Sequence, residues 1–221
     1  MGPSEMVPYT VDRATCWGGY HCPETSLGFI AGCGIHELGL AQWANTKDDT
    51  SPVRYAGTGS FPTEGVFRTM EKWDVTCEYK NGVKLRVMDA RTAKDVALKV
   101  LPAYQAGDGT IFHGSEGWIS DANGFCASNQ KLWKQEFKPS DEQLMISPEH
   151  NRNFIDCVKS RRETICPVEM AIRCDTICHL SVIAARTGRT IDWDPEKERI
   201  IGDREAAKML ERTYRKKWKV W

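Results

Sequence analysis

The side chains with the clearest chemical potential lie near the start of the chain. Trp17, Tyr20 and His21 stand in a glycine-rich stretch, and flat aromatic faces can stack on the rings of ligands such as sugars. They are candidate binding residues, although aromatic side chains in loops also serve simply to anchor the loop. His36 follows in a helical pattern, and its imidazole is suited either to proton transfer or to packing beside a core.

The cysteines point to buried thiols rather than to a disulfide framework. There are nine of them, an odd number, and most lie within apolar patterns, which favours a reducing compartment. Cys16 and Cys22 flank aromatic residues and form half of a possible zinc site. No second closely spaced Cys/His pair follows, so we expect no metal.

The bulk composition excludes several classes of function. Lys plus Arg equals Asp plus Glu at 30 each, so no overall field attracts nucleic acid or an anionic membrane. No apolar run approaches the roughly 18 residues of a membrane span, and residues 1–10 lack the features of a signal peptide. We therefore expect a cytoplasmic protein with no nucleic-acid or membrane partner. Its locally basic end, residues 213–221, is predicted to be a solvated tail.

The elements that must position these residues follow a simple order. Residues 1–25, rich in Gly, Pro and aromatics, are predicted to form a leading loop. Residues 34–45 have helical spacing. A series of strands follows at residues 53–60, 73–79, 83–88, 110–113, 117–121 and 124–128. Asn81-Gly82 is predicted to form the hairpin turn between the second and third of them. Helices are predicted next at 150–159, at 168–187 with Gly188 as its stop, and at 204–212 with Asp203 as its cap.

This order of helix, strands and helices predicts an α+β fold over a single domain, residues 26–212. The sheet is expected to be open, twisted and mostly antiparallel, with helices packed on one face. The other face is available for oligomerisation. Because we expect that face to be rich in apolar residues, it should be covered by a second copy of the chain.

One glycine pattern imitates a nucleotide-binding motif. Gly32-Cys33-Gly34 follows a short apolar run and opens a helix, as a dinucleotide fingerprint does. Glu37 stands where the third glycine belongs, and antiparallel strands follow instead of a βαβ unit. We expect these glycines to permit close packing and not to bind a cofactor.

Several segments together resemble the C-terminal α/β domain of the Gfo/Idh/MocA (glucose–fructose oxidoreductase/inositol dehydrogenase) family. The resemblance covers essentially the whole chain, and its segments are Gly34–Trp43, Ser51–Val53, the Trp73–Val83 hairpin, Gly114–Ile119, His150–Asp156, Arg189 and Trp193–Pro195. It implies a domain that covers a sugar and forms oligomers, while an N-terminal Rossmann domain holds NAD(P). It also implies that His36 acts as acid and base on a sugar hydroxyl.

The sequence departs from the family pattern in two ways. No Rossmann domain and no Glu-Lys-Pro motif are present. Within the His36 motif, Gly32 and Gly39 stand where the family has aspartates, and Phe29 stands at a frequent lysine. His36 would therefore lack the carboxylate that orients a general base, unless Glu37, a candidate substrate-binding residue with Trp17, Tyr20 and His21, replaces it.

Three functional readings stay open. The first is the carbohydrate-binding and oligomerisation domain of a sugar oxidoreductase, not redox-competent alone because no side chain accepts a hydride. The second is a stand-alone structural or regulatory subunit without redox chemistry, which could assemble with a separate oxidoreductase. The third is a cofactor-free lyase or hydrolase that acts on an oxidised sugar with His36 as base.

Overall fold

The centre of the fold is a five-stranded sheet. The computed structural model describes residues 4, 6–45, 49–101, 109–122, 124–141, 143 and 145–212. Within these residues every pair in the main sheet is antiparallel, in the order β3 (Lys84–Met88), β2 (Lys72–Glu78), β1 (Arg54–Ser60), β7 (Ile191–Asp194) and β8 (Arg199–Ile201). The predicted antiparallel sheet and the Asn-Gly hairpin are thus confirmed, and Gly82 takes the positive φ of 88° that the turn requires.

The last predicted strands form a second, smaller sheet instead of extending the first. They are β4 (Ile111–Gly114), β5 (Gly117–Ser120) and β6 (Cys126–Ala127). The expectation of one continuous sheet is wrong here because the chain leaves the main sheet after β3. Asp89 accepts hydrogen bonds from the N–H groups of Arg91 and Thr92 and so caps a helix that the sequence analysis missed, α5 (Ala90–Ala97).

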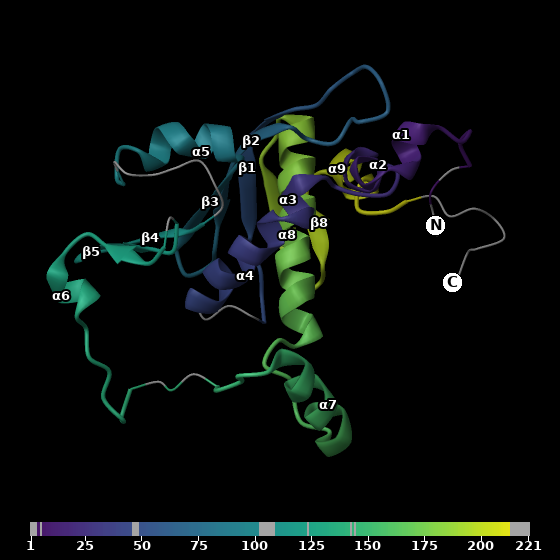
Figure 1. Ribbon diagram of the computed structural model, residues 1–221. Helices are drawn as coiled ribbons and strands as arrows, with labels where there is room; N and C mark the ends of the chain where they lie inside the picture. The colour runs from purple at the N-terminus through teal and green to yellow at the C-terminus, as the bar shows by residue number, and fades with distance from the viewer. Residues whose placement is uncertain are drawn as a thin grey trace.

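One long helix covers one face of the main sheet. Helix α8 (Val168–Thr187) has the predicted bounds, and Gly188 ends it in the left-handed conformation at φ 64°. It lies across β1 and β2, and α3 (Phe29–Gly32) and α4 (Gly34–Ala44) pack against it in turn (Figure 1). The core lies between these layers and includes Tyr55, Val75, Ile177, Leu180 and Ile191.

A buried polar contact fixes α4 to the sheet. The Tyr79 hydroxyl donates to Gln42 Oε1, and Gln42 Nε2 donates to the carbonyl of Thr50 at 2.8 Å. Burial raises the pKa of Tyr79, so its hydroxyl keeps its proton and remains a donor. Since Gln42 itself is fully buried, this contact sets how α4, with His36 and Glu37, stands over the sheet.

The opposite face of the main sheet is charged, which corrects the expectation of an apolar open face. Strand alternation turns Val75 and Cys77 toward α8 and turns Asp74, Thr76 and Glu78 away from it. Several of these charges pair between neighbouring strands. Arg86 binds Asp74 through two hydrogen bonds at 2.6 and 2.8 Å, Arg54 binds Asp192 at 2.8 Å, and Lys84 binds Glu78 at 3.1 Å.

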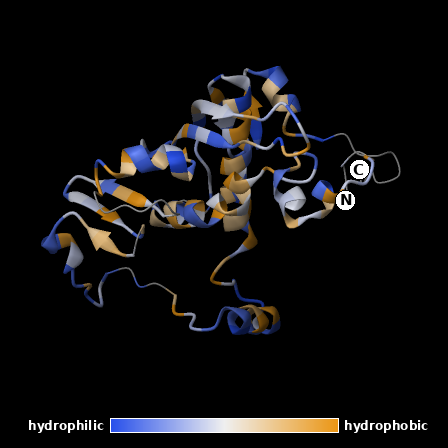
Figure 2. Cartoon of the chain, turned by 45° about the horizontal axis from the view of Figure 1, so that its top comes forward, coloured by the Kyte–Doolittle hydropathy of each residue, from blue (hydrophilic) through white to orange (hydrophobic). Residues whose placement is uncertain are grey.

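The leading segment is not the loop that was predicted for residues 1–25. It contains two short helices, α1 (Val11–Ala14) and α2 (Cys16–His21), each capped by a threonine side chain. The remaining helices are α6 (Gln130–Trp133), α7 (His150–Ser160) and α9 (Arg204–Lys208), and α9 has the predicted Asp203 cap. Figure 2 shows α7 with hydrophilic and hydrophobic residues, apart from the sheet.

Two further expectations concern the ends of the chain and membranes. Residues 213–221, predicted as a basic tail, lie outside the described residues. Among the helices that the structure describes, none combines the length and the apolar character needed to cross a bilayer.

Candidate functional site

Helix α2 presents its aromatic side chains on one side. Thr15 accepts a hydrogen bond from the Gly18 N–H at 3.1 Å, which starts the helix. Gly18 is needed for close approach, because a Cβ there would lie 2.3 Å from the carbonyl oxygen of Asp12 in α1. Trp17 and His21 are four residues apart and therefore share a helix face, where their rings stack at 5.7 Å between centroids.

Further rings from other segments complete an aromatic surface. The Phe29 ring meets His21 edge-on at 4.8 Å and lies 5.6 Å from Tyr20, and the Phe67 ring lies 6.1 Å from His21. Trp17 is 57% exposed and Phe29 38%. We call this surface, formed by Trp17, Tyr20, His21, Phe29 and Phe67, the aromatic face. It offers flat apolar surface to solvent, as a site for stacking a ring requires.

The histidine of the aromatic face is held from two directions. Its Nδ1 is 3.1 Å from Thr69 Oγ1, and its carbonyl accepts from the N–H groups of Arg68 and Thr69. Gly28, at φ 84°, lets the chain pass close to Thr69, since a Cβ there would be 2.6 Å from Thr69 Oγ1. The aromatic face is therefore fixed before any ligand arrives, which lowers the entropy cost of binding.

The packing of the aromatic face also explains why position 32 is a glycine. A Cβ at Gly32 would lie 2.3 Å from Cε1 of the Tyr20 ring and 2.8 Å from Cδ1. The Tyr20 ring therefore occupies the space that any larger side chain at this position would need. At Gly39, by contrast, an added Cβ would meet nothing within 4 Å. Of the two glycines that stand at expected carboxylate positions, one is required by packing and the other is not.

His36 and Glu37 lie elsewhere on α4 and point in different directions. His36 is exposed in the first turn of the helix. The Glu37 carboxylate accepts a hydrogen bond from Thr110 Oγ1 at 3.4 Å, next to the smaller sheet. Consecutive helix residues diverge by about 100°, and Glu37 is thus directed away from the imidazole that it was expected to orient. The structure brings together Trp17, Tyr20 and His21, and it separates Glu37 from His36.

The two phenylalanines of the aromatic face were not among the residues expected from the sequence. From the sequence, Phe29 stands out only because it replaces a lysine that is frequent in the family. Its position after Gly28, close to the tyrosine and tryptophan, was a usable signal. Phe67 carried none, because a loop between β1 and β2 brings it to His21 from 46 residues further along the chain.

The residues of the imitated nucleotide motif do not fit a dinucleotide. Gly32 ends α3 and Gly34 begins α4, so Gly32-Cys33-Gly34 joins two helices and does not follow a strand. The Tyr20 ring fills the space beside Gly32. A pyrophosphate site needs a glycine turn between a parallel strand and a helix N-terminus, and in the described sheets all strand pairs are antiparallel.

Cys16 and Cys22, which the sequence offered as half of a possible zinc site, differ in exposure. Cys22 is buried and Cys16 is exposed. Within the described ranges no three His, Cys, Asp or Glu side chains gather closely enough to hold a metal. Burial raises the pKa of the Cys22 thiol more than the nearby Arg13 lowers it, so Cys22 stays protonated and is a poor ligand.

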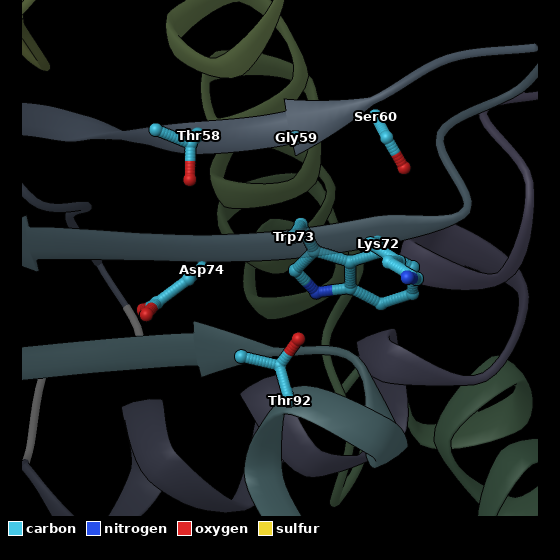
Figure 3. Close-up of a pocket in the computed structure, with 7 residues that line it drawn as sticks. All are labelled: Thr58, Gly59, Ser60, Lys72, Trp73, Asp74 and Thr92. Atoms are coloured by element: carbon cyan, nitrogen blue, oxygen red, sulfur yellow. The ribbon is translucent and has the colours of Figure 1, made fainter.

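Two hollows lie away from the aromatic face. One, of about 350 Å³, is on the charged face of the main sheet, where Thr58 and Ser60 of β1 stand beside Lys72 and Asp74 of β2 and Thr92 of α5 (Figure 3). The other, of about 700 Å³, lies at the far end of the sheet and is lined by Ser51, Tyr79, Trp193, Asp194, Pro195 and Ile201, among others. Neither contains a residue expected from the sequence to bind a ligand.

Two segments of the family resemblance meet beside the larger hollow. The Trp193 indole N–H donates to Ser51 Oγ at 3.1 Å, and the Trp193 backbone N–H donates to the carbonyl of Val53 at 2.8 Å. Trp193 and Ser51 are both buried. These residues join β7 to the start of β1, so they hold the sheet together.

Comparisons with known proteins agree with this fold. The family described as "Oxidoreductase family, C-terminal alpha/beta domain" of the Gfo/Idh/MocA group matches residues 1–220. Among solved structures, GenD2 from gentamicin A biosynthesis in complex with NAD is similar with a TM-score of 0.51 at 14% identity, covering 81% of this chain and 52% of that one. At this identity the likeness concerns the fold alone.

Two other structures are less similar. The aldose–aldose oxidoreductase from Caulobacter crescentus complexed with glycerol has 13% identity and a TM-score of 0.44, with 75% of this chain and 47% of that chain covered. An oxidoreductase from Agrobacterium radiobacter in complex with NAD+, L-tartaric acid and magnesium has 15% identity and a TM-score of 0.43, with 83% and 53% covered. The chain thus spans about half the length of these structures. A comparison with curated proteins finds no match.

Proposed function

Because the chain belongs to the Gfo/Idh/MocA oxidoreductase family as its C-terminal alpha/beta domain, we propose that it is the carbohydrate-binding and oligomerisation domain of a sugar oxidoreductase. The observation that carries the proposal is the aromatic face. Trp17 and Phe29 expose their rings around a histidine whose position is fixed by Thr69. Sugar rings bind to such surfaces through their C–H faces, with polar groups at the edge providing orientation.

The division of labour follows from the chemistry of hydride transfer. Oxidation of a sugar alcohol removes a hydride and a proton, and protein side chains can take only the proton. We propose that NAD(P), the hydride acceptor, is held by another domain or by a separate oxidoreductase subunit. In this scheme the present chain holds the sugar, and His36 takes the hydroxyl proton without help from Glu37, which is engaged with Thr110.

Ligand-observed NMR tests the carbohydrate site directly. We expect saturation transfer from the protein to monosaccharides such as glucose, and we expect Trp17→Ala to abolish it because the exposed ring is lost. Trp133→Ala is the matched control, since Trp133 is 54% exposed, almost as much as Trp17, and lies on α6 far from the aromatic face. Equal signals from both variants and the unaltered protein would refute the proposed site.

Self-association through the open sheet is the second part of the proposal. The face opposite α8 is charged, with Arg54, Asp74 and Arg86 among its residues, so association there should weaken as salt screens the charges. We expect sedimentation at micromolar concentration to give a dimer or larger oligomer at low salt and a lower mass at high salt. A monomer under both conditions would remove oligomerisation from the proposal.

One observation favours a non-redox alternative, a stand-alone structural or regulatory subunit. Tyr20 fills the space beside Gly32, and Phe29 packs on the same ring. Two positions where polar groups were expected are therefore devoted to packing and cannot transfer protons. Adding NAD(P)-dependent oxidoreductases from the same source to the purified chain discriminates between the readings, because a regulatory subunit would change their activity while His36→Ala would not alter the effect. The cofactor-free lyase reading gains no such support, since the Glu37 carboxylate accepts a hydrogen bond from Thr110.

A further inference from the structure

Four arginines from distant parts of the chain gather beside the aromatic face. The Glu24 carboxylate accepts from Arg13 at 3.3 Å and from Arg68 at 2.9 Å. Arg212 donates to the main-chain oxygen of Glu24 at 2.7 Å. Arg186, in the last turn of α8, completes this arginine cluster. Its segments, α1, the loop between β1 and β2, the end of α8 and the residues after α9, lie on one side of the molecule (Figure 1).

Arg186 is placed without a carboxylate. Its guanidinium carbon lies 4.0 Å from the centroid of the Phe61 ring, an arrangement that suits a cation. Burial lowers the pKa of Arg186, and the like charge of Arg68 lowers it further. Phe61 belongs to the loop between β1 and β2 that also carries Arg68, and no ion pair of Arg186 occurs among the described residues.

One residue, Glu24, holds three of these arginines within the described part of the chain. Burial is the largest single influence on the pKa of Glu24 and acts to raise it. The backbone and Arg13 hydrogen bonds, with the charges of Arg13 and Arg68, outweigh burial, so the pKa is lowered. Three arginines therefore converge on a residue with a single carboxylate.

One of these arginines also has an unsatisfied donor. The Nε atom of Arg68 is buried and has no hydrogen-bond partner. A buried donor without an acceptor costs free energy, and like charges held close together repel each other. An oxyanion that displaces the groups covering this atom would relieve both costs, because a guanidinium fork matches the two oxygens of a carboxylate or phosphate.

The arginine cluster is continuous with the aromatic face. The Arg68 backbone N–H donates to the carbonyl of His21 at 2.9 Å, and Phe67, the preceding residue, contributes its ring to the aromatic face. On the other side, the Arg13 backbone packs against Gly18, next to Trp17. A single small ligand could therefore lie on the rings and reach the arginines.

We propose that the carbohydrate bound by this domain is acidic, with its ring on the aromatic face and its carboxylate or phosphate in the arginine cluster. This inference rests on the proposed function and narrows its substrate class from sugars in general to anionic sugars. Arg186 and Arg68 would bind the anionic group, while Arg13 and Arg212 keep Glu24 and its neighbours in place.

Calorimetric titration of the full chain with glucose, glucuronate, glucose 6-phosphate, acetate and inorganic phosphate tests this. We expect one or both acidic sugars to bind roughly tenfold more tightly than glucose, as one charge-assisted hydrogen bond would give, and more weakly as salt rises. Arg186→Gln and Arg68→Gln should each lower that preference at least severalfold while glucose binding is retained. Arg91→Gln, which removes an exposed arginine on the opposite side of the molecule at α5, is the matched control.

The outcomes separate the two proposals. Equal affinity for glucose and both acidic sugars, or a preference that survives both arginine variants, would overturn the acidic-sugar inference and leave the carbohydrate site standing. Acetate or phosphate binding as tightly as the sugars, unaffected by Trp17→Ala, would confirm an anion site and refute the ring contact. If nothing binds to a chain with unchanged circular dichroism, the carbohydrate site itself is wrong. The affinities for glucuronate and for glucose 6-phosphate, compared with each other, show whether the site prefers a carboxylate or a phosphate.

Discussion

The glycine beside Tyr20 allows a sharp test of the aromatic face. We expect Gly32→Ala to destabilise the chain, because the new Cβ would lie 2.3 Å from the Tyr20 ring, whereas carbon atoms pack at about 3.5–4.0 Å. The ring must therefore move by more than about 1 Å. That movement loosens its contact with Phe29, and aromatic pairs of this kind contribute about 0.5–1.5 kcal/mol. Overpacking commonly costs about 1–3 kcal/mol in total.

Gly39 provides the matched control for this substitution. It lies in the middle of α4 with open space around an added Cβ, so Gly39→Ala should stabilise the helix by up to about 1 kcal/mol. The two Gly→Ala variants should then differ by roughly 2–3 kcal/mol in unfolding free energy. At about 2–4 °C per kcal/mol for a chain of this size, their melting temperatures should differ by about 4–12 °C.

A double variant identifies the ring as the cause. In a Tyr20→Ala background, Gly32→Ala should cost little, so the coupling between the two sites should reach about 1–3 kcal/mol. Urea unfolding followed by circular dichroism measures the unaltered protein, the three single variants and the double variant. The reasoning is refuted if Gly32→Ala is as stable as Gly39→Ala, or if its cost is the same with and without the tyrosine ring.

Other features of the fold give shorter predictions. Tyr79→Phe should lower the unfolding free energy by about 0.5–1.5 kcal/mol, because the buried hydrogen bond from the Tyr79 hydroxyl to Gln42 Oε1 is lost; an unchanged urea midpoint would contradict this. Burial would raise the pKa of Asp89, but the hydroxyl and N–H groups that donate to it hold the pKa below its usual 3.8. The ionised Asp89 carboxylate therefore contributes to the free energy of unfolding above the unfolded pKa, and this contribution is lost as the pH falls below about 4. The stability difference between the unaltered protein and Asp89→Asn should shrink in acid. A constant difference across pH would count against this reasoning. Gly188→Ala should cost about 1–2 kcal/mol in melting experiments from backbone strain alone at φ 64°, since no atom lies near an added Cβ; no loss of stability would mean that the turn relaxes.

The features predicted from the sequence are those with local causes. The bounds of α8 follow from its apolar stripe and from Gly188, the β2–β3 turn follows from Asn81-Gly82, and the start of α9 follows from Asp203. In each case neighbouring residues supply the hydrogen bonds or dihedral angles. Helix α5 had a similar signal in Asp89, which the run of strands around it obscured.

The features that were missed depend on distant residues. Helices α1 and α2 are four and six residues long, and isolated helices of this length are unstable in water. Helix α2 forms because Phe29 packs on it and the Arg68 and Thr69 N–H groups satisfy its last carbonyl. No pattern within residues 1–25 contains that information, which is why the sequence predicted a loop there.

Only the part of the candidate site that lies on one short segment could be predicted from the sequence. Trp17, Tyr20 and His21 could be grouped because they lie on one short segment. The separation of Glu37 from His36 depends on Thr110, 73 residues further along the chain. Likewise, Arg13, Arg68 and Arg212 come together at Glu24 from three separate segments, and only the folded chain shows that they meet.

These contacts place structural and binding roles on the same short helix. Helix α2 owes its conformation to the residues that surround it, and those residues, Phe29, Phe67 and Arg68, are also the ones that would contact a ligand. A ligand that bridges the rings and the arginines would therefore add to the interactions that keep α2 folded, and would relieve the repulsion between Arg68 and Arg186. The cost of ordering α2 is met mainly by the fold before the ligand binds, and the ligand then stabilises a helix that is already formed.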